Sequence, residues 1–192
     1  MKTLVLGSSS PFRKKLLEKL QIPFLTASPD IDETALPNET AEQLVRRLSI
    51  AKAQAVAKKY PDALIIGSDQ VGVVNGEVFG KPLTHENAVK QLQTMSGSVL
   101  CFYIGLCLLD AKSGEQQVCV ETFTVKLREL SLATIENYLA KEQPYQSAGS
   151  IKAEGLGIAL FESTQGNDPN AIIGLPLIQL VTMLKKVDVE IL

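Results

Sequence analysis

The chain has no tryptophan and few other aromatic residues, with six Phe and four Tyr among 192 residues. Proteins that hold single-stranded nucleic acids stack the bases on aromatic side chains, so such a platform is disfavoured. The chain also lacks an excess of positive charge, because 19 Lys and Arg stand against 21 Asp and Glu and leave a net charge of −2. Nucleic-acid polymers, which are bound mainly through basic surfaces, are therefore not expected as partners.

Histidine, cysteine and long apolar runs are also scarce. The single histidine, His85, excludes zinc sites built on several imidazoles. The three cysteines form no Cys-x-x-Cys pair, which favours buried apolar roles in a reducing compartment. The longest apolar run, residues 99–109, is about half of a membrane span, and the start of the chain lacks a signal-peptide core. We therefore expect a cytoplasmic protein with no membrane contact.

What the chain does have is a 45% share of hydrophobic residues, enough for a folded core. Their periodicity predicts alternating strands and helices, and hence an α/β fold with a mixed, twisted sheet and flanking helices. The expected strands are 3–6, 24–27, 63–66, 71–74, 77–79, 99–109, 117–127 and 158–162. The expected helices are 11–20, 40–60, 84–95, 131–143 and one that begins near 177.

Local signals mark several boundaries. Ser10 before Pro11 is typical of a helix N-terminus, and residues 40–43 (Thr-Ala-Glu-Gln) form a capping box. The Asn-Gly pair at 75–76 predicts a tight hairpin. We expect the strand at 63–66 to end at Gly67, so that Asp69 projects from the edge of the sheet, where α/β proteins place ligands.

A serine-rich turn leads into the first helix. Ser8, Ser10 and the following Arg13 would add hydroxyls and a positive charge to the backbone N–H groups at a helix N-terminus, a combination that suits phosphate oxygens. The alternative is that Ser10 only caps the helix and Arg13 is a solvated surface residue. This segment alone leaves the two interpretations open.

Two acidic segments offer oxygen ligands. Asp30, Asp32 and Glu33 suit Mg²⁺ or Mn²⁺, although a solvated acidic turn is the better explanation of this segment taken by itself. Asp69 could hold a metal or accept a proton from water, against the alternative of a turn-forming aspartate. An apolar strand precedes Asp69 and a hairpin follows it, which favours the functional interpretation.

Common nucleotide motifs are absent. Residues 75–82 come close to a P-loop, but Asn75 and Pro82 replace required residues, so only Lys81 remains as a phosphate-binding cation. Neither a Gly-x-Gly-x-x-Gly nor a Gly-x-Ser-x-Gly motif occurs. Together with Arg13 and Lys52, these segments suit a polyphosphate ligand.

These motifs, taken together, resemble the Maf family of nucleotide pyrophosphatases. The resemblance extends in order from residue 4 to about residue 184. It rests on Ser8-x-Ser10-Pro-x-Arg13, Asp32-Glu33-Thr34, Ala51-Lys52-Ala53, Gly67-Ser68-Asp69-Gln70, Gly80-Lys81-Pro82 and Asp168-Pro-Asn-x-x-x-Gly174-Leu-Pro. Each motif is weak by itself, but the set is specific.

The resemblance implies one domain over residues 1–192, with two lobes around a central active-site cleft, an architecture related to inosine-triphosphate pyrophosphatases, and a possible homodimer. It implies a hydrolase that cleaves a nucleotide between its α- and β-phosphates with a divalent metal, Mg²⁺ or Mn²⁺. By the same resemblance, Asp69 would activate water and, with Glu33, hold the metal. The residues that would bind phosphate are Ser8, Ser10, Arg13, Lys52 and Lys81.

Within the family, Gln70 and Glu154 resemble the branch that acts on 7-methyl-GTP. Methylation at N7 makes guanine cationic, so a carboxylate and an aromatic face should favour it. Phe12 stands where this branch has Trp, and its alternative is a core residue in line with Leu16 and Leu20. The reaction could also act on dTTP, UTP or CTP. The chain could instead be a non-catalytic nucleotide-binding regulator of cell division, or a sugar-nucleotide transferase.

Overall fold

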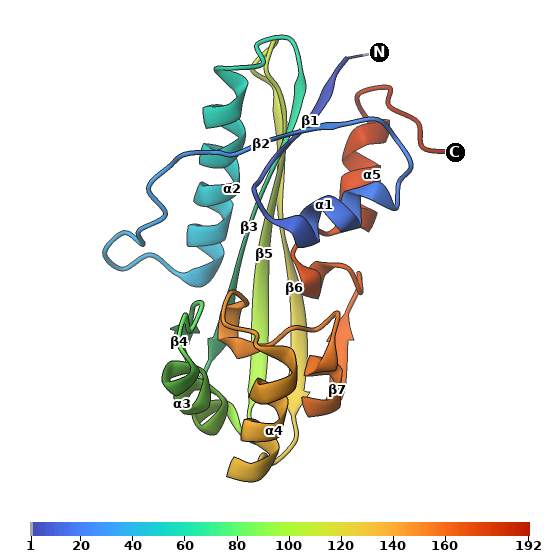
Figure 1. Ribbon diagram of the computed structural model, residues 1–192. Coiled ribbons are helices and arrows are strands. Elements are labelled where there is room, and N and C mark those ends of the chain that lie inside the picture. Colours follow the sequence, from blue (N-terminus) through green and yellow to red (C-terminus); the bar gives the residue numbers. More distant parts are fainter. Residues whose placement is uncertain (1) are drawn as a thin grey trace. The chain divides into compact units, whose positions relative to one another are not determined.

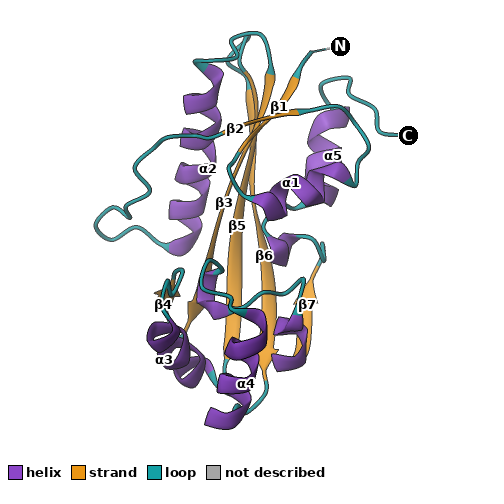
Figure 2. Ribbon diagram, viewed as in Figure 1, coloured by secondary structure: helices purple, strands orange, loops and turns teal. Residues whose placement is uncertain are grey.

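The computed structural model describes residues 2–192, which form one sheet and its flanking helices (Figure 1, Figure 2). The strands are β1 (Leu4–Gly7), β2 (Leu25–Ala27), β3 (Leu64–Val74), β4 (Glu77–Phe79), β5 (Val99–Asp110), β6 (Gln116–Leu127) and β7 (Phe161–Gly166). The α-helices are α1 (Pro11–Glu18), α2 (Ala41–Ala57), α3 (His85–Met95), α4 (Leu132–Glu142) and α5 (Leu177–Lys185). Three short 3₁₀ helices are η1 (Ala148–Ser150), η2 (Leu156–Leu160) and η3 (Ala171–Ile173).

The sheet has the strand order β2-β1-β3-β5-β6-β7, and β4 pairs with β3. β1 is parallel to both β2 and β3, whereas the pairs β3–β4 and β6–β7 are antiparallel. The α/β class with a mixed sheet and flanking helices is therefore confirmed.

The chain divides into two compact units. Unit 1 contains the described residues up to 70, 104–121 and 168–192, and unit 2 contains residues 71–103 and 122–167. β3, β5 and β6 each contribute residues to both units. The single cleft shared by two lobes stays a prediction, and each unit is described separately below.

Unit 1 is built in three layers because successive side chains of a strand point to opposite faces. Along β1, Val5 packs in one apolar cluster with Ala53 and Val56 of α2. Leu4 and Leu6 pack in a second cluster with residues of α1 and α5, among them Leu16, Leu17, Leu180 and Leu184. Figure 1 shows α2 on one side of these strands and α1 with α5 on the other.

Helix α2 approaches the sheet closely at two glycines. A Cβ on Gly67 would lie 2.1 Å from the carbonyl oxygen of Ser49, and one on Gly105 would lie 2.1 Å from that of Val45. Both glycines therefore make room for the helix backbone. The expectation that the strand ends at Gly67 is wrong, because β3 continues without a break to Val74 and this glycine serves packing rather than a turn.

Unit 2 contains the predicted hairpin, in which Asn75 and Gly76 both have positive φ between β3 and β4. Helices α3 and α4 pack against each other and against η1 and η2 respectively. The strand predicted at 158–162 is partly wrong: residues 158–160 belong to η2, and β7 begins at Phe161.

Helix boundaries follow the predicted caps. The side chains of Ser10, Thr40, Thr84 and Ser131 each accept a hydrogen bond from the backbone N–H three residues later, and Thr40 with Gln43 forms a complete capping box. In the described part of the chain, no helix has the length and apolar character needed to cross a membrane.

Candidate functional site

The site in unit 1 is centred on Asp69, which lies inside β3 and not at its end. Only 6% of the residue is exposed. The expectation that Asp69 projects from the edge of the sheet is thus wrong, because β3 runs on past it. The strand instead holds this carboxylate at a fixed position beside α2, as a reactive group on a rigid element requires.

Lys52 of α2 joins two carboxylates. Its Nζ lies 2.6 Å from Oδ1 of Asp69 and 2.8 Å from Oε1 of Glu33. The side chains of Lys52 and Asp69 are buried, whereas that of Glu33 is exposed on the loop before α2. A buried ammonium needs such partners, because an unpaired charge is costly to remove from water.

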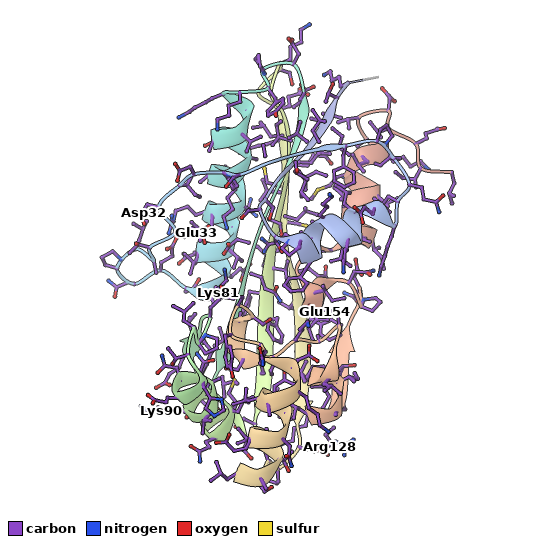
Figure 3. The ribbon with its side chains drawn as sticks, in the orientation of Figure 1. Asp32, Glu33, Lys81, Lys90, Arg128 and Glu154 are labelled. Atoms are coloured by element: carbon purple, nitrogen blue, oxygen red, sulfur yellow. The ribbon has the colours of Figure 1, made fainter. Side chains whose placement is uncertain are left out.

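Of the acidic loop, the structure brings Glu33 to this pair but not Asp32. Oδ1 of Asp32 accepts a hydrogen bond from the N–H of Thr34, 2.9 Å away, in a local turn. Hydrogen bonding to the side chain of Thr34, and then to its N–H, lowers the pKa of Asp32. Figure 3 shows both labelled residues on the loop that passes α2. Asp30 is exposed on the same loop. Glu33 is therefore the acidic residue of this segment that lies with Lys52 and Asp69.

The serine turn and α1 bring a second positive charge. The backbone N–H of Ser10 donates to Oγ of Ser8 (3.1 Å), and the N–H of Arg13 donates to Oγ of Ser10 (3.4 Å). The capping role weighed for Ser10 is therefore confirmed, and phosphate binding by these residues stays a prediction.

Arg13 is not a solvated surface residue. Its Nε donates to the carbonyl of Gly174 at 2.8 Å. Burial lowers the pKa of the guanidinium, while the charges of Asp69 and Glu33 raise it. Arg13 therefore interacts electrostatically with Asp69 and Glu33, the two carboxylates that Lys52 contacts.

Two neighbours of Asp69 on β3 face the other way. Oγ of Ser68 donates to the carbonyl of Gly174 (3.0 Å), and Nε2 of Gln70 donates to the carbonyl of Ile172 (2.8 Å). The carbonyl of Gly174 thus accepts from both Ser68 and Arg13. The amide of Gln70 is engaged with the backbone of the segment that precedes α5, whereas its predicted role is to read the base.

Asp168 fixes that segment. The residue is almost fully buried, and its Oδ1 accepts from the N–H and the side-chain amide of Asn170, both at 2.8 Å. Its Oδ2 accepts from the N–H of Ile178 in the first turn of α5, at 2.7 Å. A carboxylate in this place accepts hydrogen bonds from N–H groups that have no partner within the helix. Its negative charge is also stabilised by the positive N-terminal end of the helix dipole.

Phe12 lies in the first turn of α1 and is half-buried. Leu16, Leu17 and Leu20 of the same segment belong to the apolar cluster of α1 and α5. Both interpretations of Phe12, an aromatic face for the base or a core residue, stay predictions.

Lys81 and Glu154 belong to unit 2 (Figure 3). Lys81 is exposed on the loop after β4, whose Gly80 carbonyl accepts from Nε2 of Gln91 at 3.2 Å. Glu154 is exposed in a turn held by Glu142, whose carboxylate contacts Nζ of Lys152 (2.5 Å) and the N–H of Leu156 (2.6 Å). Their roles beside the residues of unit 1 stay predictions.

The donor set suits a hard divalent cation. Glu33 and Asp69 already converge on one positive charge, the ammonium of Lys52. Among residues 2–192, no group of three or more His, Cys, Asp or Glu could hold a metal ion. Mg²⁺ is commonly held by one or two carboxylates together with substrate phosphates, so two converging carboxylates fit it.

Sequence reasoning gave Ser68 no role of its own and missed the pair Arg47–Glu39. The period-two alternation of β3 could have placed Ser68 on the face opposite to Asp69. Arg47 belongs to no motif recognised in the sequence. Only the structure shows its guanidinium bonded to the carboxylate of Glu39 at 2.6 and 2.7 Å and to the carbonyl of Thr34 at 3.0 Å.

Comparison with known proteins gives a consistent result. A family model described as "Maf-like protein" matches residues 3–187. A protein of Colwellia psychrerythraea named 7-methyl-GTP pyrophosphatase is 55% identical over 192 residues, covering 100% of this chain and 96% of that protein. Proteins of the same name from Nitrosococcus oceani and Pseudomonas savastanoi pv. phaseolicola are 53% and 54% identical, over 99% and 100% of this chain and 96% and 100% of theirs.

Among solved structures, the Staphylococcus aureus Ham1 protein has a TM-score of 0.48 at 20% identity, covering 67% of this chain and 73% of that one. A HAM1 protein from Coxiella burnetii has a TM-score of 0.49 at 15% identity, covering 83% of this chain and 98% of that one.

Proposed function

The chain belongs to the Maf family, and from that premise we propose that it hydrolyses 7-methyl-GTP to 7-methyl-GMP and diphosphate. The observation that carries the proposal is the buried carboxylate of Asp69, held 2.6 Å from Lys52 with Glu33 on the same ammonium. Relatives of 53% to 55% identity over nearly the whole chain are named for this activity.

The reaction consumes one water and breaks one P–O–P linkage between the α- and β-phosphates. Lys52 is bonded to Oδ1 of Asp69, so we assign to Oδ2 the proton of the attacking water. A base positioned in this way contributes about 10²- to 10⁴-fold to a rate. The bond from Lys52 holds the Asp69 carboxylate in one orientation, which a proton acceptor needs.

In the proposal, residues of unit 1 bind most of the negatively charged triphosphate. Arg13 and the hydroxyls of Ser8 and Ser10 lie at the N-terminus of α1, where backbone N–H groups also favour anions. Glu33 and Asp69 would hold Mg²⁺ or Mn²⁺, which when bound neutralises phosphate charge. Lys81 supplies a further cation in the proposal.

Base selectivity is assigned to Phe12 and Glu154. A half-buried aromatic ring can lie against the cationic ring of 7-methylguanine, and an exposed carboxylate can accept hydrogen bonds from its N1–H and N2 amine. Gln70 is given a smaller part, because its amide nitrogen is engaged with Ile172.

Product identification tests this function. We expect wild-type protein with Mg²⁺ or Mn²⁺ to convert 7-methyl-GTP to equal amounts of 7-methyl-GMP and diphosphate, detected by ³¹P NMR, without an acceptor molecule. Release of inorganic phosphate instead would contradict cleavage at the α–β linkage. Nucleotide binding without turnover would favour the non-catalytic regulator.

A further inference from the structure

The loop between β2 and α2, residues 28–40, carries Glu33 and has little apolar packing. Most of its residues are exposed, including Leu36 with 55% exposure. The hydrophobic effect therefore contributes little to its conformation. Its polar contacts with α2 must decide where Glu33 lies.

Arg47 of α2 makes the densest set of these contacts. Nε and Nη2 of Arg47 lie 2.6 and 2.7 Å from the two carboxylate oxygens of Glu39, a bidentate pair. Nη2 also donates to the carbonyl of Thr34 at 3.0 Å, which fixes the backbone one residue after Glu33. The bonds to Glu39 raise the pKa of Arg47, and the charges of Asp32 and Asp69 add to this effect.

Glu39 continues the link into the loop. Its Oε2 accepts from the N–H of Leu36 at 2.9 Å, and its own N–H donates to the carbonyl of Leu36 at 3.1 Å. The turn between these residues has Asn38 at a φ of 60°, a conformation that asparagine tolerates well. One guanidinium thus holds the loop at both Thr34 and this turn.

We propose that Arg47 is a positioning residue for the reaction, which fastens the loop to α2 through Thr34 and Glu39 so that Glu33 reaches Lys52 and Asp69. The inference rests on the proposed function. Arg47 and Lys52 lie five residues apart on one rigid helix, about 7.5 Å along its axis. The helix that supplies Lys52 therefore also sets the place of its second carboxylate partner.

Arg47→Met should release the loop and lower kcat about tenfold, since small displacements of catalytic groups are costly. Arg47→Lys should retain part of the activity, because an ammonium cannot reproduce the bidentate pair. Arg46→Met is the matched control: Arg46 is the preceding residue of α2 and is exposed, and we expect a change in kcat of less than about twofold.

A double-mutant cycle separates positioning from a general structural effect. If Arg47 acts through Glu33, then Arg47→Met in a Glu33→Gln background should lower kcat by less than about twofold. An equal fold-loss of kcat in both backgrounds would overturn the inference, as would wild-type kcat in Arg47→Met.

Amide hydrogen exchange of residues 28–40, followed by mass spectrometry, gives a readout that needs no activity. Exchange of this segment should rise in Arg47→Met and stay at the wild-type level in Arg46→Met. Unchanged exchange in Arg47→Met would overturn the inference. If wild-type protein hydrolyses no nucleotide, the proposed function fails separately, and exchange still decides whether Arg47 fastens the loop.

Discussion

Ser68 and Asp69 are consecutive residues of β3 whose side chains form hydrogen bonds on opposite faces of the sheet. Asp69 accepts from Lys52 of α2 at 2.6 Å, and Ser68 donates to the carbonyl of Gly174 at 3.0 Å. The same carbonyl accepts from Arg13. On one face of β3, Asp69 is held by Lys52. On the other face, Ser68 bonds to the same carbonyl as Arg13, a residue whose pKa is lowered by burial and raised by the charge of Asp69.

Removing the ammonium of Lys52 should destabilise the protein. Lys52→Met leaves the buried Asp69 without its charged partner, and breaking such a pair costs about 3–5 kcal/mol. Chemical denaturation measures the free energy of unfolding. Lys58→Met at the exposed end of α2 is the control and should change it by less than about 0.5 kcal/mol.

A second substitution sharpens this test. Adding Asp69→Asn to Lys52→Met removes the uncompensated charge and should restore part of the lost stability. Additive losses in the double variant would show that Lys52 stabilises the fold for another reason.

Gly67→Ala should weaken the packing of α2 on the sheet. The added Cβ would lie 2.1 Å from the carbonyl oxygen of Ser49 and 2.9 Å from the backbone nitrogen of Ala53, so the helix must shift. Overpacking of this kind costs about 1–3 kcal/mol, measured by denaturation. Gly80→Ala is the control, because nothing lies within 4 Å of its Cβ position. Equal stability of the two variants would contradict the close approach.

The pair Arg47–Glu39 predicts a pH dependence of stability. The hydrogen bonds from Arg47 lower the pKa of Glu39 to about 2. Because the folded-state pKa is lowered, ionised Glu39 stabilises the protein above its unfolded-state pKa, and this contribution is lost as pH falls from about 4.5 to about 2. Tm of wild type should exceed that of Glu39→Gln at neutral pH. The difference should shrink in the acid range, and a constant difference would contradict the prediction.

Base selectivity is predicted to depend on Phe12 and Glu154. Phe12→Trp should lower KM for 7-methyl-GTP about two- to fivefold relative to GTP, since the larger indole strengthens a cation–π contact. Glu154→Gln should reduce the preference for the methylated base. Steady-state kinetics on both nucleotides measures each effect. Unchanged KM ratios would make Phe12 an ordinary packing residue and remove Glu154 from base recognition.

Much of the fold could be predicted because short-range signals determine it. The caps at Ser10 and Thr40 and the hairpin at Asn75 depend on residues within a few positions of each other. The length of β3 could not be predicted, because a glycine after an apolar strand suggests a strand end. Gly67 instead lies inside β3, where it makes room for the backbone of α2. Long-range packing decided that position.

The site shows the same division. The family pattern identifies Lys52 and Asp69, and the structure places them in contact. Arg47 is an ordinary helix arginine in the sequence, since its contacts with Thr34 and Glu39 depend on how the loop folds back. The pairing of Gln70 with Ile172 joins residues that are 102 positions apart, beyond any local pattern.

The central claim is tested most directly by kcat/KM for diphosphate release from 7-methyl-GTP, GTP, dTTP, UTP and CTP, with wild type and Asp69→Asn. We predict that 7-methyl-GTP is the best substrate and that Asp69→Asn lowers kcat/KM by about 10² or more, while Lys52 keeps an oxygen partner. A preference for dTTP, UTP or CTP would contradict the substrate assignment. Full turnover by Asp69→Asn would contradict the catalytic role of Asp69.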